Sequence, residues 1–540
     1  MSKDIEIPRG KRTKKYRFFE MLPAMLSYSL VILLFVLSII NPLLGAIYLL
    51  LIIASTLVKA VGTAYRTLQG YKIVKKAQRV DWANRFNDLT KPHDAYERLY
   101  GVKSEAYDFD QHVQNLKLLS IADKGNHPDP KEVYHAVIMV AYNEGMETLA
   151  PSIQAVAETT FDNKRIIFVL GYEERGGEEI EVTAKKLKEQ FKDTFYEFLL
   201  VKHPDGIKGE IKGKGPNLTC AGEALTKYVE KKNIPVENVI ITSLDSDNRL
   251  SKSYLDYVAY EFVVNNNRQH MSFQPVSLFM NNIWDAPALM RVVGVSNSFF
   301  NIITTMRPHA IRNFASHSQP LAALKGMNFW SKRTIVEDGH QFWRSLFYFD
   351  GDYEVLPIRV PIYQDVVVGE TLWEALKAQF VQLRRWDYGA SDVAYVGVRL
   401  FSKDRNMPFW PLFTKFVRLL DGHVMLAVMA PVVAFGGWVP MLMNLGARSA
   451  VAYNLPSVVG IIQTVAMIGL LVTILTSMKM LPKRPERYKK GRSALMVLQW
   501  VLMPFVAILY QSAAAFYSQT RLFLGKYMEN FDVTRKIVKK

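Results

Sequence analysis

Apolar and polar positions divide this 540-residue chain into two apolar ends and a mixed centre. Near the N-terminus, residues 25–40 and 43–61 form two apolar runs that hold a single charge, Lys59, and Asn41-Pro42 between them is a turn signal. Each run approaches the roughly 20 apolar residues that cross a bilayer, so the pattern predicts a pair of transmembrane helices. A signal peptide fits poorly, because a second run follows at once and no small-residue cleavage site is clear. A buried core hairpin is the remaining alternative.

Three further apolar runs lie near the C-terminus. Residues 424–441 and 458–478 predict a second pair of transmembrane helices. The third run, residues 494–524, is interrupted by Pro504 and carries polar side chains in its second half. A single span there would put the basic tail on the side of the membrane opposite to the other basic segments. We therefore favour an interfacial or re-entrant helix.

The charge of the chain, +17 at pH 7, is concentrated beside the apolar runs. Basic residues precede the first run and follow the second and fourth. Residues 444–456, which connect the third and fourth runs, contain a single basic residue, Arg448. By the positive-inside rule, both termini and the central region are cytoplasmic and the chain is integral to the plasma membrane. The lipid bilayer accounts for much of the charge, so nucleic acid is not needed as a partner. The single cysteine, Cys220, excludes a disulfide framework and Cys-cluster metal sites.

The central region alternates short β-rich runs with polar helical segments. The predicted strands are residues 133–140, 165–170, 197–202 and 236–244, and the predicted helices are residues 146–158, 178–191 and 217–231. This alternation predicts an α/β domain with a doubly wound, mostly parallel sheet. Ligands of such sheets bind beyond the carboxyl ends of the strands. The polar segment 81–130 before it predicts a helical connector beside the membrane.

Carboxylates gather directly after three of these predicted strands, in AYNEG (141–145), YEER (172–175) and DSDN (245–248). Asp245 and Asp247 follow an apolar strand, and alternation would place both on one side, where their oxygens could hold a hard divalent cation. Asp and Asn are also common turn residues, so this pattern alone is weak. Neither GxGxxG nor a P-loop lysine motif occurs here, which argues against a common dinucleotide oxidoreductase or ATPase.

Three later segments carry further candidate chemistry. The loop KGKGPN (212–217) presents lysines before a helix, where an anion could bind, or it is a solvated surface loop. Glu337-Asp338 could supply a general base, or it is a pair of acids at a helix start. QLRRW (382–386) places an Arg beside a Trp, which suits a phosphate and a stacked sugar, although a membrane-interface helix would have the same composition.

Taken in order, these segments resemble the membrane-integrated family-2 glycosyltransferases of the GT-A fold, the group that contains cellulose, chitin and hyaluronan synthases. The two leading and two trailing spans match that family's layout. The tail also resembles the FxVTxK gating loop of the cellulose synthases, with Phe531, Val533, Thr534 and Lys536 at the matching positions. In that family an interfacial helix precedes the loop, which covers the donor on the cytosolic face.

The resemblance implies a role for each matched residue. Binding of the nucleotide sugar would fall to Tyr142, Asn143, Glu144, Glu173, Lys214, Asp245 and Arg385. Asp245 and Asp247 would hold Mg²⁺ or Mn²⁺ against the diphosphate, and Asp338 would be the general base. Gln382 and Trp386 would line the acceptor site. The implied reaction is a single in-line displacement with inversion, without the covalent nucleophile of retaining enzymes.

The predicted organisation joins these parts in chain order. It comprises a basic cytoplasmic N-terminus (1–24), two transmembrane helices (25–61), a cytoplasmic connector (62–130), a GT-A catalytic domain (131–364), interfacial helices with the QxxRW motif (365–422), two transmembrane helices (423–479), a basic loop with an interfacial or re-entrant helix (480–530) and a gating-loop-like tail (531–540).

The predicted function is an inverting membrane glycosyltransferase with a nucleotide-sugar donor, expected to be a UDP-sugar. It would build a β-linked polysaccharide processively and pass it through its own spans. One alternative is transfer of a single sugar to a lipid or lipid-linked acceptor. A non-catalytic membrane transporter or basic scaffold is the alternative outside the enzymes.

Overall fold

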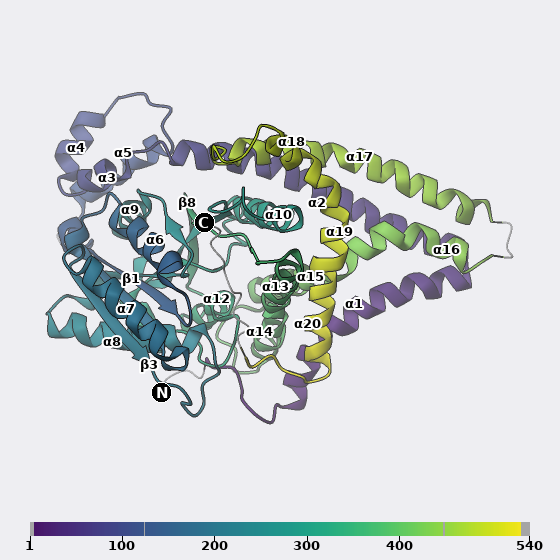
Figure 1. Ribbon diagram of the computed structural model, residues 1–540, viewed down its shortest axis with the longest axis horizontal. Coiled ribbons are helices and arrows are strands. Elements are labelled where there is room, and N and C mark those ends of the chain that lie inside the picture. The colour runs from purple at the N-terminus through teal and green to yellow at the C-terminus, as the bar shows by residue number, and fades with distance from the viewer. Residues whose placement is uncertain (1–4, 124, 446–448, 531–540) are drawn as a thin grey trace.

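The computed structural model describes residues 5–123, 125–445 and 449–530. An α/β domain occupies one end of the molecule, and long apolar helices extend from it toward the other end (Figure 1). The chain therefore separates into the two parts that its hydrophobic pattern predicts.

Among the residues that the structure describes, four segments are long and apolar enough to cross a membrane: Lys14–Ile40 (α1), Pro42–Ala77 (α2), Phe409–Leu442 and Gly491–Phe523. The turn between α1 and α2 forms as expected, since the Asn41 side chain accepts a hydrogen bond from the Leu43 amide (2.8 Å) and Pro42 begins α2. Phe409–Leu442 contains α15 (Phe409–Phe435) and the short α16 (Val439–Leu442). The predicted run 458–478 lies in α17 (Ala450–Met480), which packs along α2.

The segment Gly491–Phe523 differs from the other apolar helices in its direction. It consists of α18 (Gly491–Leu498), α19 (Met503–Phe505), a π-helical turn (Val506–Ser512) and α20 (Ala513–Phe523). Length and composition would allow it to span a membrane. Figure 1 nevertheless shows α19 and α20 running across the direction of α2 and α17, at the boundary between the helices and the α/β domain.

The sheet of the α/β domain has eight strands in the order β3-β2-β1-β4-β7-β6-β8-β5. The strands are β1 (Tyr134–Ala141), β2 (Ile166–Glu173), β3 (Glu197–His203), β4 (Val239–Leu244), β5 (Arg249–Leu250), β6 (Met271–Phe279), β7 (His317–Pro320) and β8 (Glu354–Gln364). The first four are parallel to one another, which confirms the four predicted strands, whereas the sheet as a whole is mixed. β7 runs antiparallel to β4 and β6, and β5 runs antiparallel to β8.

Both faces of this sheet are covered, which explains why its strands read as almost continuous apolar runs. Val137 and Met139 of β1 face a core shared with α6 (Met146–Ala157), α7 (Gly177–Phe191) and α9 (Tyr254–Val264). Ala136 and Ile138 face the opposite core, shared with α8 (Lys214–Lys231) and α11 (Leu321–Gly326). The remaining helices of this part are α10 (Ala288–Thr305), α12 (Glu337–Tyr348), α13 (Leu372–Asp387) and α14 (Asp392–Leu400).

The connector packs against the α/β domain. α2 continues to Ala77, well beyond the predicted end at residue 61, so the first part of the predicted connector is the end of α2. Its helices α3 (Trp82–Asp88), α4 (Pro92–Leu99) and α5 (Phe109–Ile121) lie at the outer end of the α/β domain (Figure 1). Their apolar side chains join the core around α9.

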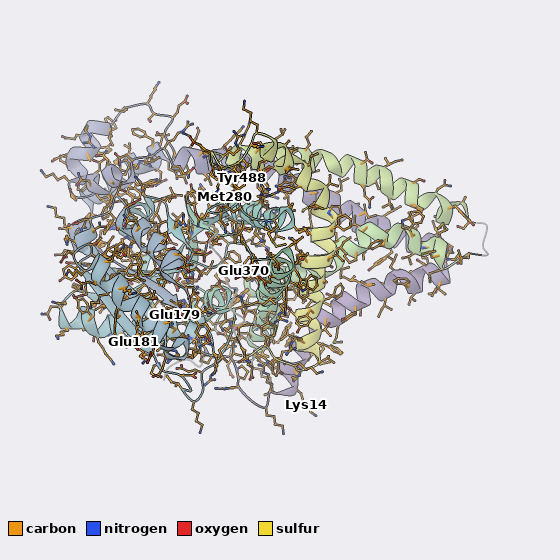
Figure 2. All side chains as sticks on the ribbon, in the orientation of Figure 1. Lys14, Glu179, Glu181, Met280, Glu370 and Tyr488 are labelled. Atoms are coloured by element: carbon orange, nitrogen blue, oxygen red, sulfur yellow. The ribbon has the colours of Figure 1, made fainter. Side chains whose placement is uncertain are left out.

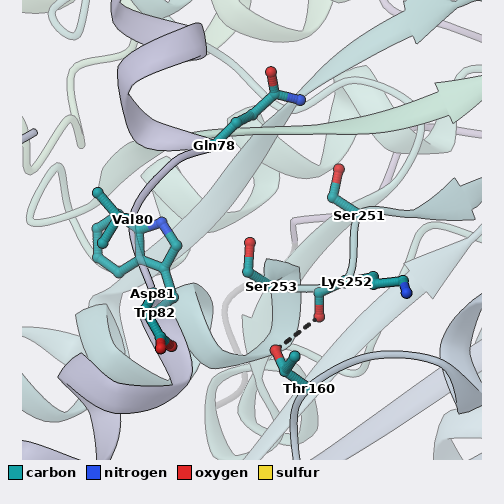
Figure 3. A pocket seen from close by; sticks show the side chains of 8 residues that line it. All are labelled: Gln78, Val80, Asp81, Trp82, Thr160, Ser251, Lys252 and Ser253. Carbon is teal, nitrogen blue, oxygen red and sulfur yellow. Dashed lines mark hydrogen bonds between the residues drawn. The ribbon is translucent and has the colours of Figure 1, made fainter.

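Trp82 is the main contact between the connector and the domain. Its side chain is 1% exposed, its ring stacks on Tyr257 with centroids 3.5 Å apart, and its Nε1 donates to the Ala77 carbonyl (2.9 Å). Beside it, a pocket of about 260 Å³ opens between the end of α2 and the loops at Thr160 and Ser251 (Figure 3). The connector is therefore part of the folded domain.

We expect Trp82→Ala to destabilise the α/β domain by about 3–5 kcal/mol, because it removes a buried aromatic ring and leaves a cavity. Thermal unfolding of the detergent-solubilised protein at fixed protein concentration measures this effect. Tyr100→Ala is the control, since that side chain is 70% exposed in the same connector and its loss should cost less than about 0.5 kcal/mol. Equal shifts for both variants would contradict the assigned packing.

Candidate functional site

A buried lysine stands at the carboxyl edge of the parallel strands, surrounded by acidic side chains. Lys214 Nζ lies 2.5 Å from Asp245 Oδ1 and 3.7 Å from Glu337 Oε1, and the charge of Asp338 also acts on it. Burial alone would lower the pKa of Lys214, but the three carboxylates outweigh burial and raise its pKa. The ammonium group therefore remains charged and holds the acids in one cluster.

Three distant segments supply these groups. Asp245 directly follows β4, Lys214 is the first residue of α8, and Glu337 and Asp338 form the first turn of α12. The start of α8 can approach α12 because residue 215 is glycine, since a Cβ there would lie 2.2 Å from the Ser331 carbonyl oxygen. The glycine loop, interpreted from sequence as a possible anion site or a surface loop, is thus a close-packing element.

Asp338, the predicted general base, is fixed by the backbone. Its Oδ2 accepts a hydrogen bond from the Ala315 amide and its Oδ1 accepts one from the Gly339 amide, each at 2.7 Å. Ala315 has a positive φ of 40°, an uncommon conformation for alanine that turns its amide toward this carboxylate. Both carboxylate oxygens are fixed by hydrogen bonds, and the side chain is still partly exposed. A group that accepts a proton from a bound molecule needs this combination of fixed orientation and access.

Glu337 is much more deeply buried than its neighbour, Asp338. Its side chain is 3% exposed, and this burial raises its pKa to about 8 despite the nearby charges of Lys214 and Arg385. The charge of Arg385, near the end of α13, also acts on Glu337 and lowers its pKa. Arg385 therefore lies close enough to this cluster for its charge to reach Glu337.

The DSD segment is placed differently from the prediction, because β4 ends at Leu244. Residues 245–248 form a turn closed by a hydrogen bond from the Asn248 amide to the Asp245 carbonyl (3.0 Å), so strand alternation does not orient the two acids. Asp247 Oδ2 accepts a hydrogen bond from the Asp365 amide (3.0 Å), whereas the Asp245 side chain is 30% exposed. Within the described residues, no group of three or more His, Cys, Asp or Glu side chains could hold a metal ion.

The loop after β1 is joined to this turn. Glu144 Oε2 accepts hydrogen bonds from the amides of Tyr142 (2.7 Å) and Asn143 (3.2 Å), and its Oε1 accepts one from Ser246 Oγ (3.3 Å). Glu144 therefore orders the AYNEG loop and links it to the residue between the two aspartates. The Arg175 guanidinium lies 4.3 Å from the ring centroid of Tyr142, so the loops after β1 and β2 also meet.

Glu173 belongs to a series of linked ion pairs, of which the sequence predicted only part. Its Oε2 lies 3.0 Å from Arg175 Nε and 3.4 Å from His203 Nδ1, and His203 Nε2 lies 3.0 Å from Glu210 Oε2. Burial lowers the pKa of His203, but its hydrogen bonds to the two glutamates outweigh burial and raise it. His203 ends β3, so its place at the carboxyl edge was a usable signal. Glu210 lies in a loop and carried none.

The predicted acceptor residues lie on α13. Gln382 is buried and its Oε1 accepts a hydrogen bond from Gln379 Nε2 (3.1 Å), while Trp386 is half-buried with its ring 6.0 Å from that of Phe279. The following residue, Asp387, is also buried, and burial raises its pKa well above the usual range. The tail approaches from the other side, where Asn530 forms a β-bridge with Lys212. Phe531, Val533, Thr534 and Lys536 lie outside the described residues.

Comparison with known proteins gives only distant likenesses. No protein-family model matches the chain, and no curated protein matches its sequence. Among solved structures, the chain resembles the mannosyltransferase PcManGT from Pyrobaculum calidifontis in complex with GDP-Man and Mn²⁺, at 12% identity and a TM-score of 0.40 over 78% of this chain and 98% of that one. It also resembles S. aureus TarS 1–349 at 10% identity and a TM-score of 0.36, over 73% of this chain and 93% of that one. The complex of TarS 1–349 with UDP-GlcNAc is similar at 12% identity, a TM-score of 0.35 and the same coverage.

We expect Glu337→Gln to stabilise the protein at alkaline pH only. The pKa of Glu337 is about 8 when folded and near the ordinary 4.5 when unfolded, so its contribution to stability is full below about pH 4.5 and is lost as the pH rises through 8. Between pH 5 and pH 9 the melting temperature of the variant relative to wild type should rise by at least about 4 °C, since 1 kcal/mol corresponds to roughly 2–4 °C. Glu230→Gln, at a half-exposed glutamate, is the control. A difference that does not vary with pH would contradict the buried, protonated Glu337.

Proposed function

We propose that this chain is a membrane-embedded, inverting glycosyltransferase that uses a nucleotide-sugar donor. The observation that carries the proposal is the cluster of Lys214, Asp245 and Asp338 at the carboxyl edge of the sheet, with Arg385 of α13 close enough for its charge to act on Glu337 beside them. Groups suited to bind a diphosphate and a group suited to take a proton lie together there. Their order along the chain is that of the family-2 glycosyltransferases which the sequence resembles.

The donor side of this site would be formed by the loops after β1, β2 and β4. The nucleoside would be contacted by Tyr142, Asn143 and Glu144 after β1 and by Glu173 at the end of β2. The hydrogen bonds of Glu144 hold the loop after β1 and the turn after β4 in one arrangement. Lys214 and Arg385 would meet the diphosphate, which needs cations where it lies. We expect the donor to be a UDP-sugar, with the Glu173–His203 pair close to its uracil ring.

The two aspartates fit a divalent cation that shares its coordination shell with the donor. Asp245 and Asp247 offer hard carboxylate oxygens, and Mg²⁺ commonly takes only one or two protein carboxylates when phosphates supply further ligands. Asp245 is the more accessible of the two, which suits contact with an incoming diphosphate. When bound, Mg²⁺ or Mn²⁺ would neutralise charge on the leaving group.

The acceptor side would lie between α12 and α13. Asp338 would take the proton from the attacking acceptor hydroxyl, and the amides of Ala315 and Gly339 would keep its carboxylate oriented during that step. Gln382 and Trp386 would line the acceptor path. Because attack comes opposite to the leaving diphosphate, an α-linked donor gives a β-linked product, and no side chain needs to bond covalently to the sugar.

We further propose that the product is a polysaccharide, extended processively and passed through the apolar helices. Catalytic domain and termini would be cytoplasmic, with Gly491–Phe523 in the membrane interface. One contact favours a second candidate, a lipid-linked acceptor that receives a single sugar. Ser518 Oγ of α20 donates a hydrogen bond to the Arg384 carbonyl (2.6 Å), so the acceptor helix α13 lies directly against this interfacial segment.

The donor is identified by measuring nucleoside diphosphate release from the full chain in detergent, across a panel of UDP- and GDP-sugars with Mn²⁺ or Mg²⁺. We expect release with one donor and its loss on chelation, because only two protein carboxylates hold the metal. Gel analysis of the product then separates the candidates. High-molecular-weight product supports a processive synthase, and lipid-extractable product supports single-sugar transfer. Absence of release with every donor, in the presence of native membrane lipids and sugar acceptors, would contradict the proposal.

Asp338→Asn should abolish transfer, by at least about 100-fold, while leaving the affinity for nucleotide near that of wild type. The amide is the same size but cannot accept the proton. Transfer is measured by diphosphate release and affinity by binding of the nucleotide alone. Asp352→Asn is the control, because that carboxylate is 64% exposed and pairs with His270 away from the cluster. Transfer at a comparable rate in Asp338→Asn would remove the residue from this role.

A further inference from the structure

An ion cluster joins the two ends of the chain beside the candidate site. Glu20 of α1 is fully buried, and its carboxylate pairs with Arg12 and with Arg17 Nη1 (2.5 Å). The same carboxylate accepts a hydrogen bond from the hydroxyl of Tyr527 (3.0 Å). Arg12 also lies over the ring of Tyr527, 3.7 Å from its centroid. We call these four residues, Arg12, Arg17, Glu20 and Tyr527, the clasp.

Burial makes this arrangement specific. A buried carboxylate without partners strongly destabilises the folded protein. The carboxylate of Glu20 can therefore stay buried only while both arginines and the Tyr527 hydroxyl lie close to it. Arg17 continues the connection by donating to the carbonyls of Leu522 (3.0 Å) and Phe523 (2.9 Å) at the end of α20. The N-terminal segment therefore fixes the direction in which the chain leaves α20.

The chain that leaves α20, residues 525–530, runs to the loop that precedes Lys214. The Met528 amide donates to the Tyr388 hydroxyl (3.2 Å), and Asn530 forms its β-bridge with Lys212. Tyr527 and Met528 also pack with Ile335 and Val336, the two residues before Glu337. Residues 525–530 thus touch the segments that introduce both Lys214 and the acids of α12.

The loop before Lys214 needs such support. Between β3 and α8 it contains two glycines at positive φ, Gly206 (76°) and Gly209 (101°), and residues 204–208 are exposed. Glycines in these conformations give a chain more freedom in the absence of other contacts. Misplacement of a binding group by about 1 Å can cost a large factor in rate or affinity.

We propose that the clasp is a positioning device that sets donor affinity by holding residues 525–530 against the Lys212 loop. Glu20 and Tyr527 act through the chain and not on the substrate, so they are positioning residues. This inference rests on the proposed function insofar as Lys214 binds a nucleotide sugar. Its geometric part, that loss of the clasp releases Asn530 from Lys212, does not depend on any activity.

The geometric part is tested by disulfide trapping in the full chain. Lys212→Cys and Asn530→Cys are combined with Cys220→Ser, which removes the single native thiol. Bridged residues have the Cα separation that a disulfide requires, so the pair should oxidise rapidly. Adding Tyr527→Ala should slow its formation at least about fivefold, and Tyr527→Phe, which keeps the ring under Arg12, should have a smaller effect.

Tyr488→Ala is the matched control. The Tyr488 hydroxyl also bonds a carboxylate, Asp285 Oδ1 (2.6 Å), but it lies at the opposite edge of the molecule from Lys14, the first residue of α1 (Figure 2). This variant should leave the trapping rate unchanged. An unchanged rate in Tyr527→Ala would overturn the inference. Glu20→Gln provides an independent variant from the other end of the chain, and it should slow trapping as Tyr527→Ala does.

The functional part is tested without the added cysteines. Tyr527→Ala should raise the KM for the donor about 5–10-fold while kcat changes less than about threefold, because uniform binding is lost and the reacting groups remain. Slow trapping with an unchanged KM would overturn the role in donor affinity. If wild type transfers no sugar, the proposed function fails while the trapping result still decides the clasp.

Discussion

The burial of a charged lysine among carboxylates is the constraint on which the arrangement of this molecule depends. The buried ammonium group of Lys214 needs acidic side chains beside it, the closest being Asp245, because an uncompensated buried charge costs several kcal/mol. Those acids begin or follow elements that are far apart in sequence. Their mutual attraction with one ammonium group therefore brings the end of β4, the start of α8 and the start of α12 to a single point. Backbone packing is adapted to this meeting, as the missing Cβ at residue 215 shows.

The same cluster separates two neighbouring acids into different states. Glu337 is buried and has a pKa of about 8, whereas Asp338 faces two backbone amides and is only half-buried. Adjacent residues at a helix start point in different directions, so one acid can support the lysine while the other remains accessible to a reacting hydroxyl. In the proposed function, Asp338 would be the proton acceptor and Lys214 the cation that meets the diphosphate.

Local patterns predicted the parts of this fold that depend on local sequence. The four parallel strands and helices α6, α7 and α8 followed from runs of apolar residues, and Asn41-Pro42 ended α1 as expected. Asp245 and Lys214 were recognisable because they stand at element ends. Glu210 and Tyr527 were not, since they contact His203 and Glu20 through tertiary packing that leaves no period in the sequence. The packing of the connector on the domain could not be predicted for the same reason, because the stacking of Trp82 on Tyr257 depends on a helix far along the chain.

The first helix has a double task in this account. Its apolar length makes it an anchor, while its first turns carry Arg17 and Glu20, which hold the chain that leaves α20. About two turns after Glu20, Ser27 donates a hydrogen bond to Gln519 of α20 (2.7 Å). Gln519 in turn donates to the His423 carbonyl of α15 (2.8 Å). These hydrogen bonds link α1 and α15 through α20, and the chain that leaves α20 reaches the loop before Lys214 at Asn530. The same helix therefore contacts both the long apolar helices and the segment that leads to Lys214.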